Sequence, residues 1–140
     1  MTLAEYVRRR NGVPLGAPGS LGNMLRRSFG APSFEGFWRH WNPIWSYGLG
    51  RFVYGPVRRR LPAAVAVLAT FAVSGLLHDA AATLVHRGAV FVTTPWFLLV
   101  GLGVVLGRWF GMDLSGAPPW ARGAAHLTWI GACLALALQL

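Results

Sequence analysis

Residues 62–84, PAAVAVLATFAVSGLLHDAAATL, decide the fold class of this chain. The stretch is almost wholly apolar, and Asp79 is its one residue with a full charge at neutral pH. A helix of about 20 apolar residues crosses the roughly 30 Å of hydrocarbon in a bilayer. Pro62 suits the first turn of such a helix, where its missing N–H costs nothing. The stretch therefore predicts a membrane-spanning helix that carries His78 inside it.

Two further apolar runs follow, at residues 89–107 and 121–140. Of the 140 residues, 54% are hydrophobic and 12% are charged, which excludes a disordered chain and is atypical of a soluble domain. The sequence therefore predicts an all-α integral membrane protein with about three transmembrane helices. Short interfacial amphipathic helices are expected before them, in residues 1–60.

The positive charge is concentrated at the start of the chain. All 13 basic residues are arginines, ten of them lie in residues 1–60, and the formal net charge is +9. This balance fits nucleic acid or a membrane surface, and the apolar runs favour membrane lipid as the partner and no nucleic acid. Arg58, Arg59 and Arg60 directly precede the first span, which places the N-terminus in the cytoplasm. We therefore divide the chain into a cytoplasmic, interfacial segment (1–60) and a transmembrane segment (61–140).

Local signals divide the first segment into short helices. Thr2 and Glu5 form a capping box, a helix over residues 21–29 ends at Gly30, and Ser33 can cap a third helix. Proline disfavours a helical residue before it, so residues 42–43 should begin a new helix that continues to Tyr54. Aromatic residues recur at helical spacing here: Phe34, Phe37, Trp38, Trp41 and Trp45. Their face fits an interfacial amphipathic helix, the wall of an acyl-chain tunnel, or both.

His78 is the strongest candidate for chemistry. It stands 16 residues after Pro62, about 24 Å along a helix, and an ionisable group inside a span indicates function by default. A neutral imidazole there could take a proton from a substrate hydroxyl. Ser74 and Gly75 share its helix face, whereas Asp79 points about 100° away. The alternative is a structural histidine bonded to a carbonyl oxygen.

Asn42 is the second candidate, either as a helix N-cap or as a polar group that positions a substrate oxygen. The other titratable groups form no ligand pattern, so the sequence predicts no metal and no cofactor; they include His40, His86, His126 and Asp113. Cys133, the only cysteine, excludes an internal disulfide and fits a small packed hydrophobe.

Three motifs in order carry a family resemblance. They are Phe37, Trp38, Trp41 and Asn42; then Arg51, Tyr54 and Pro56; then Ser74, Gly75, His78 and Asp79. Residues 33–79 resemble the C-terminal part of the membrane-bound O-acyltransferase (MBOAT) family. Wax-synthase-like and sterol or diacylglycerol acyltransferase members resemble the chain most in these motifs.

The resemblance implies a role for each matched residue. His78 would be the general base on a hydroxyl acceptor, and Asn42 the second polar position of the active site. Substrate would lie against Trp38, Trp41, Trp45, Arg51, Tyr54, Ser74 and Gly75. The acyl donor would be acyl-CoA or another acyl thioester, as co-substrate rather than resident cofactor.

Family enzymes have many more spans than the three expected here. The resemblance therefore implies an acyltransferase whose tunnel is completed by a homo-oligomer or by a partner membrane subunit. The alternative is a non-catalytic membrane subunit, or a degenerate fragment of the family, that scaffolds a partner. A third reading, an arginine-rich protein that binds anionic lipid, would depend on ionic strength and be indifferent to His78.

Overall fold

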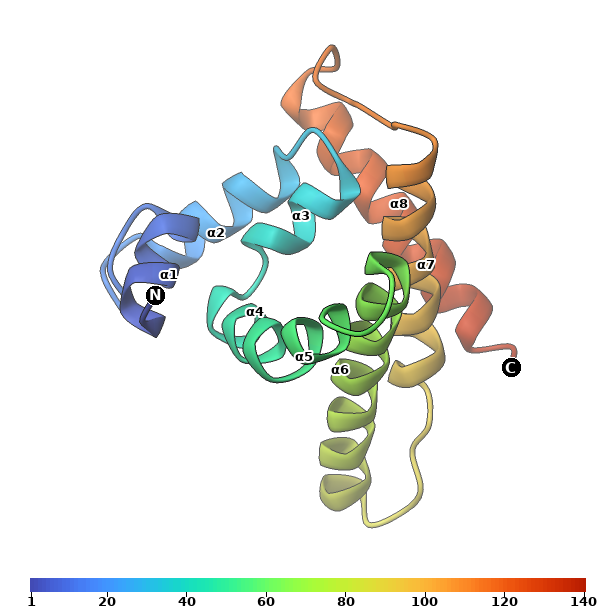
Figure 1. The fold of residues 1–140 in the computed structure, drawn as a ribbon. Helices are drawn as coiled ribbons and strands as arrows, with labels where there is room; N and C mark the ends of the chain where they lie inside the picture. The colour runs from blue at the N-terminus through green and yellow to red at the C-terminus, as the bar shows by residue number, and fades with distance from the viewer. The chain divides into compact units, whose positions relative to one another are not determined.

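The computed structural model describes residues 1–140, and its regular elements are all helical. In chain order they are α1 (Leu3–Asn11), α2 (Ser20–Phe29), α3 (Phe34–His40), α4 (Pro43–Leu49), the π-helix η1 (Gly50–Tyr54), α5 (Gly55–Arg58), α6 (Ala63–His86), α7 (Thr93–Trp109) and α8 (Pro119–Ala137). Figure 1 labels the eight α-helices. This confirms the predicted all-α class.

The chain forms two compact units. Unit 1 consists of residues 1–48 and 107–127, and unit 2 consists of residues 49–106 and 128–140. The helix α8 contributes its first half to unit 1 and its second half to unit 2. The predicted division of the chain at residue 60 was based on amino-acid composition, whereas the two units are defined by packing. The division at residue 60 therefore stays a prediction.

The predicted helix starts in unit 1 are confirmed. Thr2 and Glu5 make the reciprocal capping box of α1, and the Ser33 hydroxyl accepts a hydrogen bond from Gly36 N–H at the start of α3. The Asn42 side-chain oxygen accepts from Trp45 N–H at 3.3 Å, so Asn42 caps α4 and Pro43 is its first residue. Gly30 closes α2 as expected. These caps satisfy backbone donors and acceptors that a helix end leaves unpaired.

Aromatic side chains form the core of unit 1. Phe37 is 1% exposed, and its ring stacks on Trp41 with centroids 5.4 Å apart. Phe29 meets Phe37 edge-on at 5.2 Å, which joins α2 to α3. The ring of His126, from α8, lies 5.4 Å from that of Phe37. The predicted aromatic face therefore packs inward at Phe37, whereas Trp45 at its far end is exposed.

Arg122 holds the connection between α7 and α8. Its guanidinium donates to four backbone carbonyls at 2.7–3.0 Å, those of Gly30, Leu114, Ser115 and Ala117. His126 adds a bond of 2.9 Å between Nε2 and the Ala31 carbonyl. A glycine- and proline-rich loop is thus fixed by side chains of the helix that follows it.

The helix that begins at Pro43 runs further than expected. The sequence predicted an end at Gly55–Pro56, but Gly55 has helical dihedrals and α5 continues to Arg58. The change of winding explains the difference: Gly55 N–H bonds the Gly50 carbonyl five residues back. Pro56 lies in the first turn of α5, and this wider π-turn lets the chain continue past a residue with no N–H.

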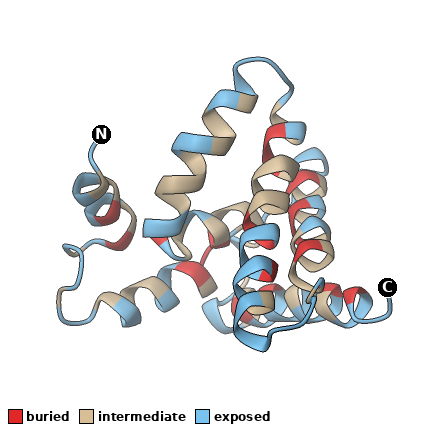
Figure 2. Cartoon of the chain, turned by 90° about the horizontal axis from the view of Figure 1, so that it is seen from below, coloured by how far each residue is buried: buried red, intermediate tan, exposed pale blue.

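Only α6 is both long and apolar enough to cross a membrane, with a mean hydropathy of 1.6. Its bounds agree with the predicted span at residues 62–84 within two residues. Exposed and half-buried residues make up most of the ribbon in Figure 2, and only 22% of the apolar window of α6 is buried. The α7 helix has 17 residues, and α8 carries Arg122 and His126 in its first half. Of the three expected spans, one therefore has the length and hydropathy of a transmembrane helix, and the expected number of three is not confirmed.

The expected start of the second apolar helix is wrong by four residues. The run was expected from residue 89, but α7 begins at Thr93. Residues 90–92 lie outside the helix because Asp79 and Thr83 of α6 bond backbone groups of Val90 and Val92. Pro95 falls in the first turn of α7, where its missing N–H removes no helix bond.

Candidate functional site

The candidate site is built on the second half of α6, in unit 2. The side chain of His78 is exposed, and its Nδ1 lies 2.6 Å from the backbone carbonyl of Ser74, one turn earlier. A carbonyl oxygen only accepts, so Nδ1 carries the hydrogen of the neutral ring. The basic nitrogen of that tautomer is Nε2. This is the bond to a carbonyl oxygen that a purely structural histidine would make. The same bond makes Nε2 the nitrogen that can accept a proton.

Phe97 of α7 fixes the ring of His78 from the side. The two ring centroids are 5.2 Å apart, with planes at 70°, which is an edge-to-face contact. Phe97 itself rests against Phe71 of α6 and Trp96 of α7. The imidazole is thus oriented by its own helix and by the neighbouring one, which lies beside it in Figure 1.

Asp79, the residue after His78, serves the fold and not the ring. It is 3% exposed and accepts four hydrogen bonds at 2.6–3.1 Å, from the N–H groups of Val92, Thr93 and Thr94 and from the Thr94 hydroxyl. These are the first amides of α7, where the helix dipole favours a negative charge. The carboxylate therefore caps α7 and ties it to α6 beside His78.

Gly75 allows this close packing. A Cβ placed on Gly75 would lie 2.5 Å from the Cα of Thr94, a distance that backbone atoms do not tolerate. The space is filled by the first turn of α7, because the Asp79 cap draws that turn against α6.

The second half of α8 completes unit 2 against α7. Trp96 Nε1 donates to the Ile130 carbonyl at 3.1 Å. The indole of Trp129 fills the space at Gly103, where a Cβ would overlap its Nε1. Trp96, which contacts Phe97, is thus bonded to α8, so α8 helps to hold Phe97 against His78.

The π-helix η1 and α5 both pack on the α6 side of unit 2. Arg51 of η1 is exposed, and its guanidinium carbon lies 6.0 Å from the ring of Phe52. Tyr54, at the end of η1, is half-buried. Wide π-turns are frequent at functional sites, so this segment is a second candidate region of unit 2.

The family model described as MBOAT, membrane-bound O-acyltransferase family, matches residues 22–106, more than half of the chain. The chain belongs to the membrane-bound O-acyltransferase family. The match includes both Asn42 and His78, and it makes the protein membrane-bound and, in general terms, a membrane acyltransferase. No curated protein and no solved structure matches the chain.

The two residues that the MBOAT resemblance puts at the centre of chemistry lie in different units: Asn42 in unit 1 and His78 in unit 2. The side-chain oxygen of Asn42 caps α4, and its backbone has φ of 41°, a left-handed value that asparagine tolerates. Within unit 1, the ring of Trp38 meets Phe34 and Phe37 edge-on. Ser74, Gly75 and His78 lie together in unit 2, and Trp38, Trp41, Asn42 and Trp45 belong to unit 1.

Sequence reasoning missed two supports of the site, namely Asp79, which holds α7 against α6, and Phe97, which contacts the ring of His78. Residues 93–95, Thr-Thr-Pro, carry a helix-start signal that could have shown where α7 begins. Nothing in the spacing relates Phe97 to His78, because they meet only through the packing of α6 and α7. No group of three or more histidine, cysteine, aspartate or glutamate side chains is placed to hold a metal ion.

Proposed function

We propose that this MBOAT-family protein transfers an acyl group from an acyl thioester, such as acyl-CoA, to a hydroxyl acceptor, with His78 as the general base. The observation that carries the proposal is the bond from His78 Nδ1 to the Ser74 carbonyl. It makes Nε2 the proton-accepting nitrogen of an exposed imidazole on the apolar helix α6. An imidazole nitrogen that carries no hydrogen is suited to remove a hydroxyl proton.

The reaction needs one proton acceptor and one leaving group. Nε2 takes the hydroxyl proton as the acceptor oxygen attacks the thioester carbonyl carbon. The tetrahedral intermediate then collapses with cleavage of the C–S bond, the ester remains, and the thiolate leaves. The imidazolium returns its proton to the sulfur, so atoms and charge balance and His78 is regenerated.

The remaining site assignments follow the family resemblance, and the topology follows the arginines before α6 and the apolar runs. Asn42 would position a substrate oxygen, and Trp38, Trp41, Trp45, Arg51 and Tyr54 would line the substrate path. The N-terminus would be cytoplasmic, with α7 and α8 as the second and third spans. Leu76, Leu77, Leu84 and Val85 are exposed on α6, so a second copy or a partner subunit would complete the tunnel there.

Acyl transfer by the purified full-length chain in nanodiscs tests the proposal. A panel of acyl-CoA donors is offered with and without alcohol acceptors, and free thiol is followed with a chromogenic disulfide. We expect acceptor-dependent thiol release that falls at least about 100-fold in His78→Ala. His86→Ala, a histidine at the end of the same helix, is the matched control and should remain within about twofold of the wild type.

Equal loss in both variants, or release that persists in His78→Ala, would remove His78 from the chemistry. No release with any donor, from protein that is folded by its thermal transition, would favour the non-catalytic subunit instead.

A further inference from the structure

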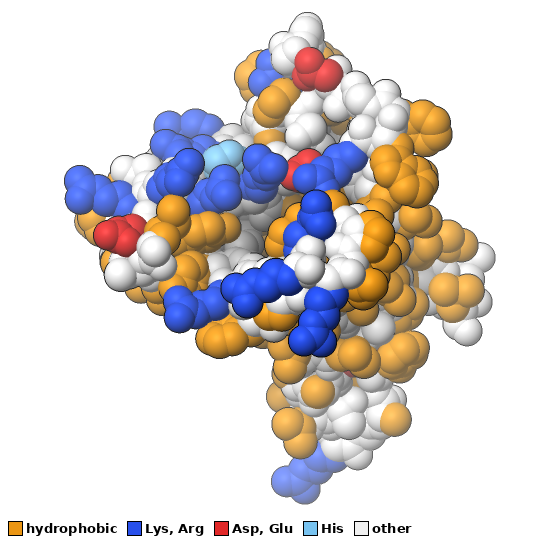
Figure 3. Space-filling model, in the orientation of Figure 1, with side chains coloured by type: hydrophobic (Ala, Val, Ile, Leu, Met, Phe, Trp, Pro, Cys, Tyr) orange, Lys and Arg blue, Asp and Glu red, His pale blue; other side chains and the backbone are white.

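Unit 1 holds a cluster of basic side chains that acyl transfer does not use. The basic cluster consists of Arg10, Arg27, Arg39 and His40, from α1, α2 and α3. The backbone carbonyl of Arg10 accepts hydrogen bonds from Arg27 Nη1 and from His40 Nδ1, both at 3.0 Å. These two bonds bring basic side chains of three helices to the end of α1. Figure 3 shows arginine side chains gathered here with a histidine among them.

Arg10 has a donor that no protein group satisfies. Its guanidinium is held over the ring of Tyr6, with 5.2 Å from Cζ to the centroid. The Nε atom is buried and has no hydrogen-bond partner. Such a group loses its water without replacement, which is unfavourable unless an acceptor arrives. A planar guanidinium with an unused N–H is matched in geometry by a phosphate group.

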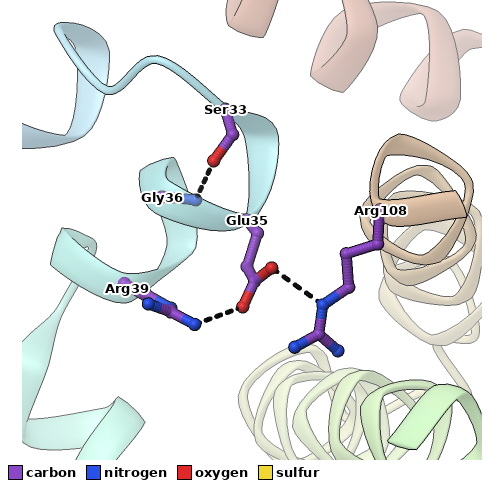
Figure 4. A network of polar contacts seen from close by, with 5 residues as sticks. All are labelled: Ser33, Glu35, Gly36, Arg39 and Arg108. Carbon is purple, nitrogen blue, oxygen red and sulfur yellow. Dashed lines mark hydrogen bonds and ion pairs between the residues drawn. The ribbon is translucent and has the colours of Figure 1, made fainter. Parts of the chain in front are cut away.

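The carboxylates of the chain compensate the charge of the basic cluster only in part. Glu5 bonds Thr2 in the capping box, Asp79 caps α7, and Asp113 bonds Ser115 in a turn. Glu35 pairs with Arg39 at 2.6 Å and with Arg108 at 2.8 Å, as Figure 4 shows, so one carboxylate serves two guanidiniums. Neither Arg10 nor Arg27 takes part in these ion pairs. The cluster therefore keeps an excess of positive charge.

The pKa of His40 reflects its burial and the positive charge of the basic cluster. Burial lowers the pKa of His40, and the charges of Arg10, Arg27 and Arg39 lower it further, against the raising effect of its bond to the Arg10 carbonyl. A histidine that resists protonation beside three cations marks a place where a bound anion would be stabilised.

The neighbouring surface indicates which anion. Leu21 is 66% exposed and Leu25 is 38% exposed on α2, the helix that also carries Arg26 and Arg27. Exposed leucines and arginines on one short helix, with no acidic residue, are typical of a helix lying in the bilayer interface. We propose that the basic cluster of unit 1 binds the phosphate group of an anionic phospholipid headgroup. This inference goes beyond acyl transfer and does not involve His78.

Binding of short-chain lipids to the purified full-length chain in neutral detergent tests the proposal by thermophoresis. The probes are dihexanoyl phosphatidylglycerol, dihexanoyl phosphatidylcholine and inorganic phosphate. Arg10→Gln removes the unsatisfied donor, and Arg39→Gln changes the cluster without removing a bond to the Arg10 carbonyl. Arg59→Gln, an exposed arginine of unit 2, is the control with the same change in charge. Thermal transitions identify variants that fail to fold.

We expect phosphatidylglycerol to bind at least about tenfold more tightly than phosphatidylcholine, and Arg10→Gln to weaken it about tenfold. Arg59→Gln should stay within twofold of the wild type.

Equal binding of the two lipids, or an equal loss in Arg59→Gln, would overturn the site. Inorganic phosphate that binds as tightly as phosphatidylglycerol would overturn the lipid as ligand. If Arg10→Gln does not fold, unchanged binding in Arg39→Gln would decide against the cluster. Thiol release in these variants separates this result from the test of His78.

Discussion

One hydrogen bond determines which nitrogen of His78 can accept a proton. The Ser74 carbonyl takes the hydrogen of Nδ1 at 2.6 Å, so the basic lone pair of the neutral ring lies on Nε2. The adjacent carboxylate of Asp79 does not share in this chemistry, because it is occupied by the amides of α7. Two neighbouring ionisable residues therefore differ in their surroundings: Asp79 is a structural cap, and His78 is the candidate base.

Asp79→Asn should destabilise unit 2. An amide nitrogen would face donors of Thr94 in place of an oxygen, which leaves buried groups unpaired and costs about 1–3 kcal/mol in free energy of unfolding. A lower thermal transition of the purified protein in detergent would report it. Asp113→Asn, an exposed turn residue, is the control and should change the transition little. An unchanged transition in Asp79→Asn would mean that the cap does not contribute to stability.

His40 should make unit 1 less stable in acid. Its pKa is lowered in the folded chain, chiefly by burial, so the unfolded chain binds more protons as the pH falls. The stabilisation is therefore present above about pH 6.5 and is lost as the pH falls through the lowered pKa. Thermal transitions from pH 7.5 to 5 should decline more steeply for the wild type than for His40→Gln. Parallel curves would contradict this.

The sequence was informative where partners are close in the chain. Thr2, Ser33 and Asn42 bond groups three residues away, so local spacing predicted their caps. Arg122 bonds the Gly30 carbonyl, and no pattern in the sequence relates residues so far apart. The candidate base His78 could be found because an ionisable group is rare in an apolar run. Its supports could not, because they depend on packing.

At the scale of the element, the contact of α6 with α7 depends on Gly75. Gly75→Ala would place a methyl group against the backbone of Thr94, which cannot move without breaking the Asp79 cap. We expect a loss of about 1–3 kcal/mol in free energy of unfolding, together with weaker acyl transfer as Phe97 withdraws from His78. Thermal transition and thiol release are the two measurements.

Gly107→Ala is the matched control for Gly75→Ala. Gly107 is also helical, and nothing lies within 4 Å of a Cβ placed there. Alanine should raise the stability of α7 by up to about 1 kcal/mol because it has the higher helix propensity. If both variants are equally unstable, the loss belongs to helix glycines in general and not to this contact.

Helix ends were predicted well when a cap marks them and badly when packing sets them. Local caps placed α1, α2 and α3 within one or two residues. The change to π-winding at Gly50 carried the α4 helix past Pro56, and capping by Asp79 delayed α7 to Thr93. Both exceptions arise from hydrogen bonds that the helix propensities of single residues do not predict.

At the scale of the whole molecule, α6 is the span that length and hydropathy support. The proposed second and third spans are tested by cysteine labelling of the full chain in intact cells, with Cys133→Ala as background. Gly88→Cys reports the connection after α6, and Gly116→Cys reports the connection after α7.

Three spans with a cytoplasmic N-terminus predict that an impermeant maleimide labels residue 88 from outside and reaches residue 116 only after permeabilisation. Labelling of both positions from outside would leave α6 as a single span. Labelling of residue 116 but not residue 88 from outside would reverse the orientation deduced from Arg58, Arg59 and Arg60.

The hydrogen bonds that Asp79 accepts at the start of α7 have a consequence for hydrogen–deuterium exchange. The leading amides of a helix usually have no acceptor and exchange early with deuterated solvent. The N–H groups of Val92, Thr93 and Thr94 instead end on a buried carboxylate. They should retain hydrogen as long as the middle of the helix does, so the start of α7 opens to deuterium only when it separates from α6.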